Sequence, residues 1–491
     1  MISGSLTTQR KITYYAMKSW SFYNRSFYAE GYGYFLYNAL SGRLLQLDEP
    51  HYRLTETLRA GDGLPCYGDL HEFMGTLDLC GFIIDKQDEG RILLAKQGMR
   101  DQKCGDASNL MLSICPTLEC NFRCSYCYEL RQSDPTIMSR ETIAKLIDFV
   151  KQHKECSKLS VSWYGGEPTL AFDVVETLTE HFLELYPDYD QASLITNGYL
   201  LDREKAEKLN LLKITNVQVT LDGLASSHDS RRPLNSGAPT YDRIIENLDT
   251  LMSSSFSGSC SVRVNIDKSN QADFPALRSE LLDRYKNKHL TVYPGRVSAT
   301  HCGTDACSAE IQGHEWADFI AQGYFENDIV PERGFYPDSS TLKTCMASMV
   351  HGYVVAPGGE LYKCWEDVGQ VSMIAGSVYS GKPDGRNVVA ARYRKEGDAF
   401  LNAECMGCQV FPICGGGCVK KRLTGQHNPE SGIYFCSPYK DGLEAYLAAY
   451  VDTYHKREIC NIILGNAKAV PMKKGYRLID PGQSGTGVER S

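Results

Sequence analysis

Closely spaced cysteines constrain this chain more than any other feature of its sequence. The chain has 19 cysteines in 491 residues, and its first residues lack the apolar core of a secretion signal. In a reducing compartment such cysteines bind metals or act as catalytic thiols rather than forming disulfides. We therefore expect a cytoplasmic protein whose cysteines carry its function.

The composition narrows the class of partner. Hydrophobic residues make up 42% of the chain and charged residues 23%, which is enough apolar material for packed cores and excludes a disordered scaffold. The formal net charge of −8 gives no general basic surface for nucleic acid or anionic lipid. No run of about 18 apolar residues occurs, so we expect no membrane-spanning helix. The sequence thus predicts neither a nucleic-acid partner nor a membrane.

Short apolar runs alternate with longer helical patterns between residues 110 and 293. This alternation is typical of repeated strand–helix units that build a parallel sheet. Six units are too few for a closed eight-stranded barrel, so the pattern predicts an α/β fold with a partial (β/α)6 barrel and an active site where the strands end. The predicted strands are 110–114, 159–163, 192–196, 217–221, 261–266 and 290–293, and the predicted helices are 140–153, 172–186, 202–212, 241–252 and 273–285.

The rest of the chain predicts smaller units on both sides of this barrel. A hairpin of strands at 34–38 and 43–47, followed by helices, predicts a small α+β N-terminal domain. Units of this kind can bind a peptide along an exposed strand edge, and a plain packing unit is the alternative. The predicted domains are this N-terminal unit at 1–100, the barrel at 105–312, a cysteine-rich region at 313–440 that is loop-like from about residue 336, and a helix near 441–451 with a polar, mobile tail within 441–491.

The first cysteine motif directly follows the first predicted strand of the barrel. Cys120, Cys124 and Cys127 stand in one loop, and this CxxxCxxC spacing lets the loop wrap one metal centre. A zinc site would want a fourth Cys or His nearby, and the next residues supply none. An iron–sulfur cube also takes four thiolates, so three leave one iron open to a ligand from outside the protein.

A second motif, Gly165-Gly166-Glu167-Pro168, follows the second predicted strand at the same rim. The two glycines allow the backbone to approach a ligand closely, and the Glu167 carboxylate can accept hydrogen bonds from an ammonium group. Such a tetrapeptide alone is an ordinary turn. After a CxxxCxxC on the preceding strand of a strand–helix series, it is specific.

Together these motifs resemble those of the radical S-adenosylmethionine (SAM) enzymes, over about residues 110–439. The resemblance implies a [4Fe–4S] cluster on Cys120, Cys124 and Cys127 whose open iron binds SAM. Reductive cleavage of SAM would then give a 5′-deoxyadenosyl radical that abstracts hydrogen from a substrate. The implied SAM contacts are Gly165, Gly166 and Glu167 at the methionine ammonium and Tyr126 at the adenine.

Further candidates follow the third and fourth predicted strands. Asn197 and Thr220 stand in rim segments that could touch SAM, and ordinary Asn-Gly and Asp-Gly turn chemistry is the alternative. His228, Asp229 and Arg231 in the next loop are candidates too. Their default expectation is a solvated loop.

The later cysteines form a second array that resembles the seven-cysteine C-terminal extension called SPASM. The resemblance includes Gly359, five residues before Cys364, and it implies two auxiliary [4Fe–4S] clusters. A zinc ribbon is the alternative for the last closely spaced cysteines. The implied ligands are Cys405, Cys408, Cys414 and Cys436 for a distal cluster and Cys345, Cys364 and Cys418 for a proximal one.

The proximal cluster is one ligand short in this assignment. Sulfatase-maturing relatives supply the missing thiol shortly before Cys345, where Ser339 and Ser340 stand here. Either Cys302 or Cys307 completes the set, or the site is open and a substrate thiolate binds there. Most cysteines outside the two arrays are expected to be buried small hydrophobes, and the full group is Cys66, Cys80, Cys104, Cys115, Cys156, Cys260, Cys302, Cys307 and Cys460.

A second departure concerns the catalytic base. Sulfatase-maturing relatives have an aspartate directly after the cysteine that corresponds to Cys364, whereas this chain has Trp365 followed by Glu366 and Asp367. Either carboxylate is a candidate base, and a solvated loop carboxylate is the alternative.

The N-terminal unit at 1–100, through residues 37–45 above all, resembles the leader-peptide-recognition units fused to radical SAM maturases. This resemblance, the SPASM array and the missing aspartate favour a radical SAM/SPASM maturase. Such an enzyme acts on a ribosomally made precursor peptide and forms a thioether or carbon–carbon cross-link between side chains. One alternative is anaerobic sulfatase maturation, which converts a side chain to formylglycine. An alternative of another class is a non-catalytic iron–sulfur electron carrier. The implied redox partner is a flavodoxin or a ferredoxin, because reductive SAM cleavage needs a low-potential electron donor.

Overall fold

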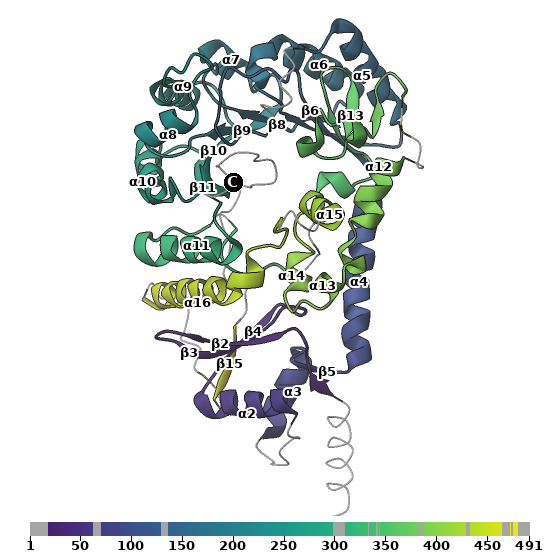
Figure 1. The fold of residues 1–491 in the computed structure, drawn as a ribbon. Coiled ribbons are helices and arrows are strands. Elements are labelled where there is room, and N and C mark those ends of the chain that lie inside the picture. The colour runs from purple at the N-terminus through teal and green to yellow at the C-terminus, as the bar shows by residue number, and fades with distance from the viewer. Residues whose placement is uncertain are drawn as a thin grey trace, which may run out of the picture.

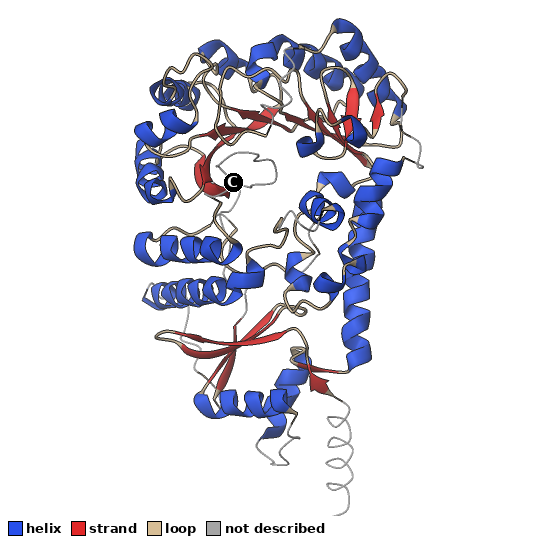
Figure 2. Cartoon of the chain, in the orientation of Figure 1, coloured by secondary structure: helices blue, strands red, loops and turns tan. Residues whose placement is uncertain are grey.

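A nine-stranded sheet forms the centre of the protein (Figures 1 and 2). The computed structural model describes residues 18–61, 70–128, 136–297, 310–331, 333–339, 342, 344–381, 383, 387–428, 433–463, 472 and 475–479. The strand order is β11-β10-β9-β8-β7-β6-β12-β13-β14. The six strands from β6 to β11 are parallel, and each lies beside its neighbour in the sequence. This arrangement confirms the predicted α/β fold with a partial barrel.

The barrel elements arise where the apolar periodicity predicts them. Helix α5 begins after Ser139, whose side chain accepts a hydrogen bond from the Thr142 amide, and it buries Leu146 and Val150 against the sheet. The helices lie along the outer arc of the sheet in Figure 1. The strands are β6 (Asn109–Ile114), β7 (Lys158–Trp163), β8 (Ala192–Thr196), β9 (Ile214–Thr220), β10 (Ser259–Ile266) and β11 (Leu290–Arg296), and the helices are α5 (Arg140–Gln152), η2 (Pro168–Ala171), α6 (Phe172–Leu185), α7 (Arg203–Lys208), α8 (Ala225–Arg231), α9 (Tyr241–Ser253), η3 (Gln271–Asp273) and α10 (Phe274–Arg284).

The cysteine-rich region contributes to this sheet, which the sequence did not predict. Strand β12 (Gly352–Val355) pairs in parallel with β6, and β13 (Glu360–Tyr362) and β14 (Gly376–Ser377) follow in antiparallel order. The prediction of loops alone for this region is therefore wrong. Short helical segments fill the rest: η6 (Met346–Ser348), η7 (Trp365–Asp367), η8 (Val371–Met373), α12 (Val388–Ala391), the π-helix η9 (Arg392–Glu396), η10 (Ala399–Leu401), α13 (Ala403–Met406), α14 (Phe411–Cys414) and α15 (Val419–His427).

A separate antiparallel sheet forms the N-terminal unit. Its strand order is β15-β4-β3-β2, so strand β15 (Tyr476–Ile479) from the far end of the chain pairs with β4. This part of the tail was expected to be mobile and is instead a strand. The other elements are β1 (Ser19–Trp20), β2 (Asn24–Ala29), β3 (Gly33–Asn38), β4 (Arg43–Leu47), α2 (Glu49–Ala60), α3 (Leu70–Leu79) and β5 (Ile83–Ile84), which pairs with β1.

Three long helices connect these units (Figure 1). Helix α4 (Lys86–Gly105) runs from the N-terminal unit to the start of β6 and crosses the predicted boundary near residue 100. Helix α11 (Gly313–Asn327) packs against α16 (Tyr439–Ile463), which extends the predicted helix at 441–451. Within the described ranges, no helix is long and apolar enough to cross a membrane.

Candidate metal and cofactor site

The loop after β6 holds the three cysteines of the first motif. The segment that follows α8 fixes this loop, because the Arg123 amide donates to the Pro233 carbonyl at 2.9 Å and the Ser125 amide to the Arg231 carbonyl at 3.1 Å. The Cys127 amide donates to the Cys124 carbonyl at 3.2 Å, which closes the loop into a turn. The CxxxCxxC motif is therefore held in place by contacts outside the motif.

The electrostatics of the three thiols fit a metal centre. Burial raises the pKa of the Cys120 thiol, and the charges of Glu167, Cys124 and Cys127 raise it further. Each of these groups therefore lies within electrostatic reach of Cys120. Thiols in such a site stay neutral unless a cation is bound, and a bound metal deprotonates its thiol ligands outright. The donor set fits an iron–sulfur cluster.

The glycines of the second motif allow two backbones to meet. Gly165 has φ +117°, and a Cβ there would lie 2.5 Å from the Thr117 carbonyl oxygen. A Cβ on Gly166 would lie 2.2 Å from the Glu119 carbonyl oxygen, a distance that real Cβ atoms do not show. The glycines therefore bring the tetrapeptide against the chain just before Cys120.

Glu167 connects the ends of two strands. Its carboxylate accepts hydrogen bonds from the Thr169 amide at 3.0 Å, the Thr169 hydroxyl at 2.6 Å, the Thr196 hydroxyl at 2.6 Å and the Asn197 amide at 2.6 Å. The side chain is 1% exposed, and burial raises its pKa although these hydrogen bonds lower it. Three of these donors meet Oε1 and one meets Oε2, so Oε2 keeps an acceptor position. Its first role is to tie the rim after β7 to the rim after β8.

The remaining predicted SAM contacts lie around the same rim. The Tyr126 hydroxyl accepts from Arg232 at 2.7 Å and from Asn265 at 2.9 Å. The Asn197 side-chain amide donates to the Asn121 side chain at 2.8 Å and contacts the Cys120 sulfur at 3.9 Å. Thr220 is the last residue of β9 and is buried.

A buried charged network beneath Tyr126 was missed by the sequence reasoning. Arg231 donates to Asp267 at 2.6 Å, lies 3.5 Å from Asp222, and has its guanidinium 5.2 Å from the centre of the Tyr126 ring. His228 is fully buried and accepts from the Asp222 amide at 3.1 Å, and burial lowers its pKa well below the usual range. The expectation of a solvated loop is therefore wrong for Arg231 and His228. The run of polar residues suggested exposure, but His228 contacts Thr240 at the start of α9 and Arg231 pairs with Asp267 just after β10.

Asp229 also has a structural position. Its carboxylate accepts hydrogen bonds from the Thr240 amide at 2.8 Å and the Tyr241 amide at 2.9 Å. These are the first residues of α9, so Asp229 stabilises the start of that helix.

Four of the later cysteines line one small cavity. Cys405, Cys408, Cys414 and Cys436 face it together with Lys440. Burial raises the pKa of Cys405 to about 11, and the thiolates of the other three cysteines contribute to the rise. The structure therefore brings together all four residues that the sequence assigned to a distal cluster.

The cysteines assigned to the proximal cluster form a looser set. Cys364 directly follows β13 and Lys363, and its pKa is raised by burial and also by Cys418. Burial likewise raises the pKa of Cys418, with Cys345 contributing. Cys418 thus lies within electrostatic reach of both Cys364 and Cys345. Cys302 and Cys307, the predicted candidates for the fourth ligand, lie outside the described residues.

The two candidate bases have different environments. Asp367 is fully buried, pairs with Lys420 and accepts a hydrogen bond from the Tyr393 hydroxyl. Burial raises its pKa, and the Lys420 ammonium opposes that rise. Glu366 is half-buried and lies near Cys418, whose pKa it raises. A base needs access to its substrate, so this arrangement favours Glu366 over Asp367.

An aromatic contact joins the two cysteine regions. The ring of Trp365, directly after Cys364, lies 4.9 Å from the ring of Tyr164, directly before Gly165. Trp365 is 40% exposed, so one side of this contact faces solvent. Cys364 of the second array therefore lies close to the rim that carries the Gly165–Pro168 motif.

A profile of the Radical SAM superfamily matches residues 114–281. The chain therefore contains a radical SAM domain. The matched range covers the strands and loops that carry Cys120, Cys124, Cys127 and the Gly165–Glu167 motif. The confirmed family uses a [4Fe–4S] cluster and SAM, and its members are enzymes.

Relatives of this radical SAM enzyme include maturases and a cyclase. The serine-type anaerobic sulfatase-maturating enzyme of Bacteroides thetaiotaomicron is 23% identical over 390 residues, which cover 70% of this chain and 90% of that protein. A probable GTP 3′,8-cyclase of Saccharolobus solfataricus is 33% identical over 138 residues, 28% of this chain and 42% of that protein. The solved structure of native anSMEcpe with bound AdoMet and Cp18Cys peptide has a TM-score of 0.53 at 19% identity, covering 72% of this chain and 99% of that chain. The structural likeness confirms the radical SAM fold.

Proposed function

We propose that this radical SAM enzyme modifies a ribosomally made precursor peptide and forms a thioether or carbon–carbon cross-link between its side chains. The observation that carries the proposal is the position of the second cysteine array, because Trp365, which follows Cys364 of that array, contacts Tyr164 at the rim. An enzyme that needed only SAM cleavage would have no use for a second set of thiols beside that rim. The cysteine-rich region packs against the barrel through β12, and such an arrangement suits a reaction with further redox steps on an extended substrate.

The proposed ligands of the first cluster are Cys120, Cys124 and Cys127. When bound, the cluster and SAM supply a strong hydrogen-abstracting radical to the site. Tyr126, held by Arg232 and Asn265, is the proposed contact to the adenine. The other proposed SAM contacts are Gly165, Gly166, Glu167, Asn197 and Thr220.

Glu167 has a restricted role in this proposal. Its carboxylate accepts from Thr169, Thr196 and Asn197 and so fixes the rim to which SAM binds, and only Oε2, which accepts a single hydrogen bond, has a position left for the ammonium group. Any contact of Glu167 with an ammonium group must share oxygens that already accept hydrogen bonds. The glycines serve the same purpose, because they hold the rim against the cysteine loop.

The auxiliary clusters are proposed on the remaining cysteines. Cys405, Cys408, Cys414 and Cys436, which line one cavity, are the proposed distal ligands. Cys345, Cys364 and Cys418 are proposed for the proximal cluster. Glu366, next to Cys364 and Cys418, is the proposed base that takes a proton from the substrate, since Asp367 is engaged by Lys420.

Two further features support a peptide substrate. The solved structure of anSMEcpe contains the Cp18Cys peptide, and the B. thetaiotaomicron relative is a sulfatase-maturating enzyme. The N-terminal sheet offers strand edges, to which an extended peptide can add by backbone hydrogen bonds. The proposed electron donor is a flavodoxin or a ferredoxin.

Mass spectrometry of a candidate precursor peptide tests the proposal. The peptide is incubated anaerobically with reconstituted enzyme, SAM and a reductant, and the Cys124→Ala variant is the control. Loss of two hydrogens with the sulfur retained, absent in the control, is the expected result. Loss of sulfur from a cysteine, or loss of two hydrogens from a serine with an aldehyde that hydroxylamine traps, would instead favour formylglycine formation, the activity suggested by the serine-type sulfatase-maturating relative. Fully loaded enzyme that forms no 5′-deoxyadenosine would refute the proposed radical chemistry and leave an electron carrier.

A further inference from the structure

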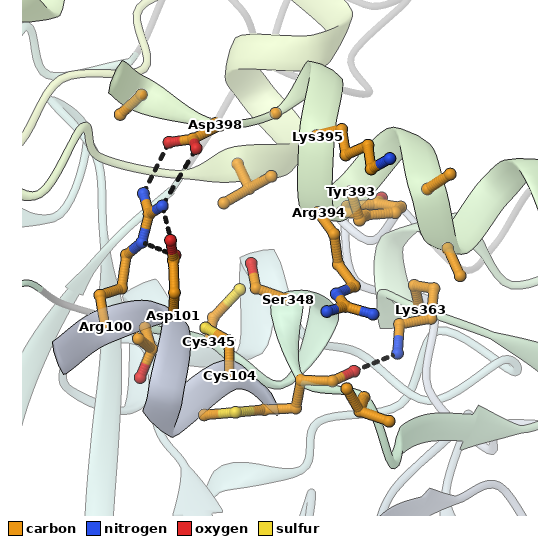
Figure 3. Close-up of a pocket in the computed structure, with 18 of the residues that line it drawn as sticks. Arg100, Asp101, Cys104, Cys345, Ser348, Lys363, Tyr393, Arg394, Lys395 and Asp398 are labelled. Carbon is orange, nitrogen blue, oxygen red and sulfur yellow. Dashed lines mark hydrogen bonds and ion pairs between the residues drawn. The ribbon is translucent and has the colours of Figure 1, made fainter. Parts of the chain in front are cut away.

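A cavity of about 860 Å³ lies between the end of helix α4 and the cysteine-rich region. Figure 3 shows its lining, with Cys104 from α4 beside Cys345 and with Lys363 and Arg394 on the opposite side. Among the cysteines outside the two predicted arrays, Cys104 was expected to be a buried small hydrophobe. It is instead half-buried and lines a polar cavity together with a predicted cluster ligand.

The end of α4 is fixed against this cavity by several contacts. The Val350 amide donates to the Cys104 carbonyl at 2.9 Å, which ties Cys104 to the segment that begins at Cys345. One turn earlier, Arg100 pairs with Asp398 at 2.6 Å and both side chains are largely buried. The side chains of Cys104 and Cys345 therefore lie together in Figure 3, because the backbone of both segments is held in place.

The thiols of this region form a connected set of four. Cys345 raises the pKa of Cys104 and of Cys418, and Cys418 raises that of Cys364. Burial is the larger cause in each case. The four thiols are thus linked pairwise in the order Cys104, Cys345, Cys418 and Cys364, and four is the number of thiolates that a [4Fe–4S] cube takes.

A buried cation points independently to an anion in the same place. Lys363 is 1% exposed, and its ammonium donates to the Met349 carbonyl at 2.7 Å and the Gly352 carbonyl at 2.6 Å. In the part of the chain that the structure describes, no carboxylate pairs with Lys363, and the anionic groups that act on it are Cys345 and Cys104. An anion in the cavity would favour the charged form of the Lys363 amine over its neutral form, and a cluster with four thiolates carries net negative charge.

We infer that Cys104 is the fourth protein ligand of the proximal auxiliary cluster, together with Cys345, Cys364 and Cys418. The inference rests on the proposed function, which puts a cluster on the last three residues. Each thiol loses its proton as its sulfur binds iron, and Lys363 and Arg394 offset the resulting charge. The set is then complete within the protein, so neither Cys302 nor Cys307 is needed and no iron is left open for a substrate thiolate. Helix α4 also joins the N-terminal sheet directly to the cluster.

Iron binding by the full-length chain tests this inference without using enzymatic activity. The parent is the Cys120→Ala/Cys124→Ala/Cys127→Ala variant, which removes the SAM cluster, so two auxiliary clusters give about eight irons per chain after anaerobic reconstitution. Adding Cys104→Ala should remove between about one and four irons, and mild oxidation should produce the EPR signal of a three-iron cluster. Cys104→Ser, which is nearly isosteric, should retain the fold and shift the EPR spectrum of the reduced cluster. Cys80→Ala, another substitution of a cysteine outside the arrays, should keep the iron content and spectrum of the parent.

The outcomes separate the two levels of the argument. A parent with about eight irons whose Cys104→Ala and Cys104→Ser derivatives keep the same iron content and spectrum overturns the inference alone. A parent with about four irons or fewer overturns the inference together with the proposed proximal cluster. Iron loss in the Cys104 variants that the Cys80→Ala control does not show supports the ligand assignment.

Discussion

Replacing Glu167 by glutamine tests how the SAM rim is held together. The four hydrogen bonds to its carboxylate join η2, directly after β7, to the end of β8. In Glu167→Gln the amide oxygen can keep the three donors at one carboxylate oxygen. The new NH2 group then faces the Asn197 amide, so a donor meets a donor in a buried site.

The size of the effect follows from these contacts. A hydrogen bond to a charged group contributes about 1.5–3 kcal/mol, and a buried donor without a partner costs about 1–3 kcal/mol. Burial raises the pKa of Glu167, so the substitution also removes the cost of burying a charge. We therefore expect a net loss of about 2–4 kcal/mol in the free energy of unfolding.

Urea unfolding in the absence of SAM measures this loss. Trp163 is fully buried at the end of β7, four residues before Glu167, and its fluorescence reports on this part of the sheet. Glu184→Gln is the matched control, because Glu184 is 74% exposed and should change stability by less than about 0.5 kcal/mol. If Glu167→Gln unfolds at the same urea concentration as Glu184→Gln, the carboxylate does not hold the rim and the reasoning is refuted.

Three further predictions concern other parts of the molecule. Below pH 6.5 the unfolded chain binds a proton at His228, whereas the folded chain does not, because its His228 pKa is lowered. The free energy of unfolding should therefore fall by up to about 1.4 kcal/mol per unit decrease in pH. His228→Asn should reduce this slope in urea titrations between pH 5 and 7. Gly166→Ala puts a Cβ 2.2 Å from the Glu119 carbonyl oxygen and should lower the free energy of unfolding by about 1–3 kcal/mol. Gly98→Ala is the control, because a Cβ there meets nothing within 4 Å and should not destabilise the protein. Equal melting temperatures of the two variants would contradict this prediction. Deleting residues 475–491 removes β15 and exposes the edge of β4. A fluorescent peptide of sequence 472–484 should then bind the truncated chain, and not the full chain, in an anisotropy titration. Equal binding to both chains would show that β15 does not cover this edge in the full chain.

The sequence by itself determined the elements of the barrel. The strands from β6 to β11 and the helices α5, α6, α7, α9 and α10 follow from the periodicity of neighbouring apolar residues, whereas α8 was expected to be a loop. The start of α5 follows from Ser139, whose side chain caps the helix. The CxxxCxxC and Gly-Gly-Glu-Pro motifs also lie within short loops, so their spacing alone indicated that each acts as a unit.

The tertiary structure decided which distant segments meet. Nothing in the local sequence indicates that β12 extends the barrel sheet beside β6, or that β15 pairs with β4. The same holds for the burial of Arg231, since a polar stretch is exposed or covered only according to what packs upon it. Such contacts depend on the whole chain, because they join residues that no periodic pattern relates.

Cys104 shows most directly the difference between what local sequence predicts and what tertiary packing decides. In the sequence it is a cysteine apart from both arrays, near the end of a polar helix. The length and direction of α4, fixed by the Arg100–Asp398 ion pair and the Val350 hydrogen bond, bring it beside Cys345. Spacing along the chain predicts ligands that share a loop, and only the packing of a long helix brings the inferred ligand Cys104 close to them.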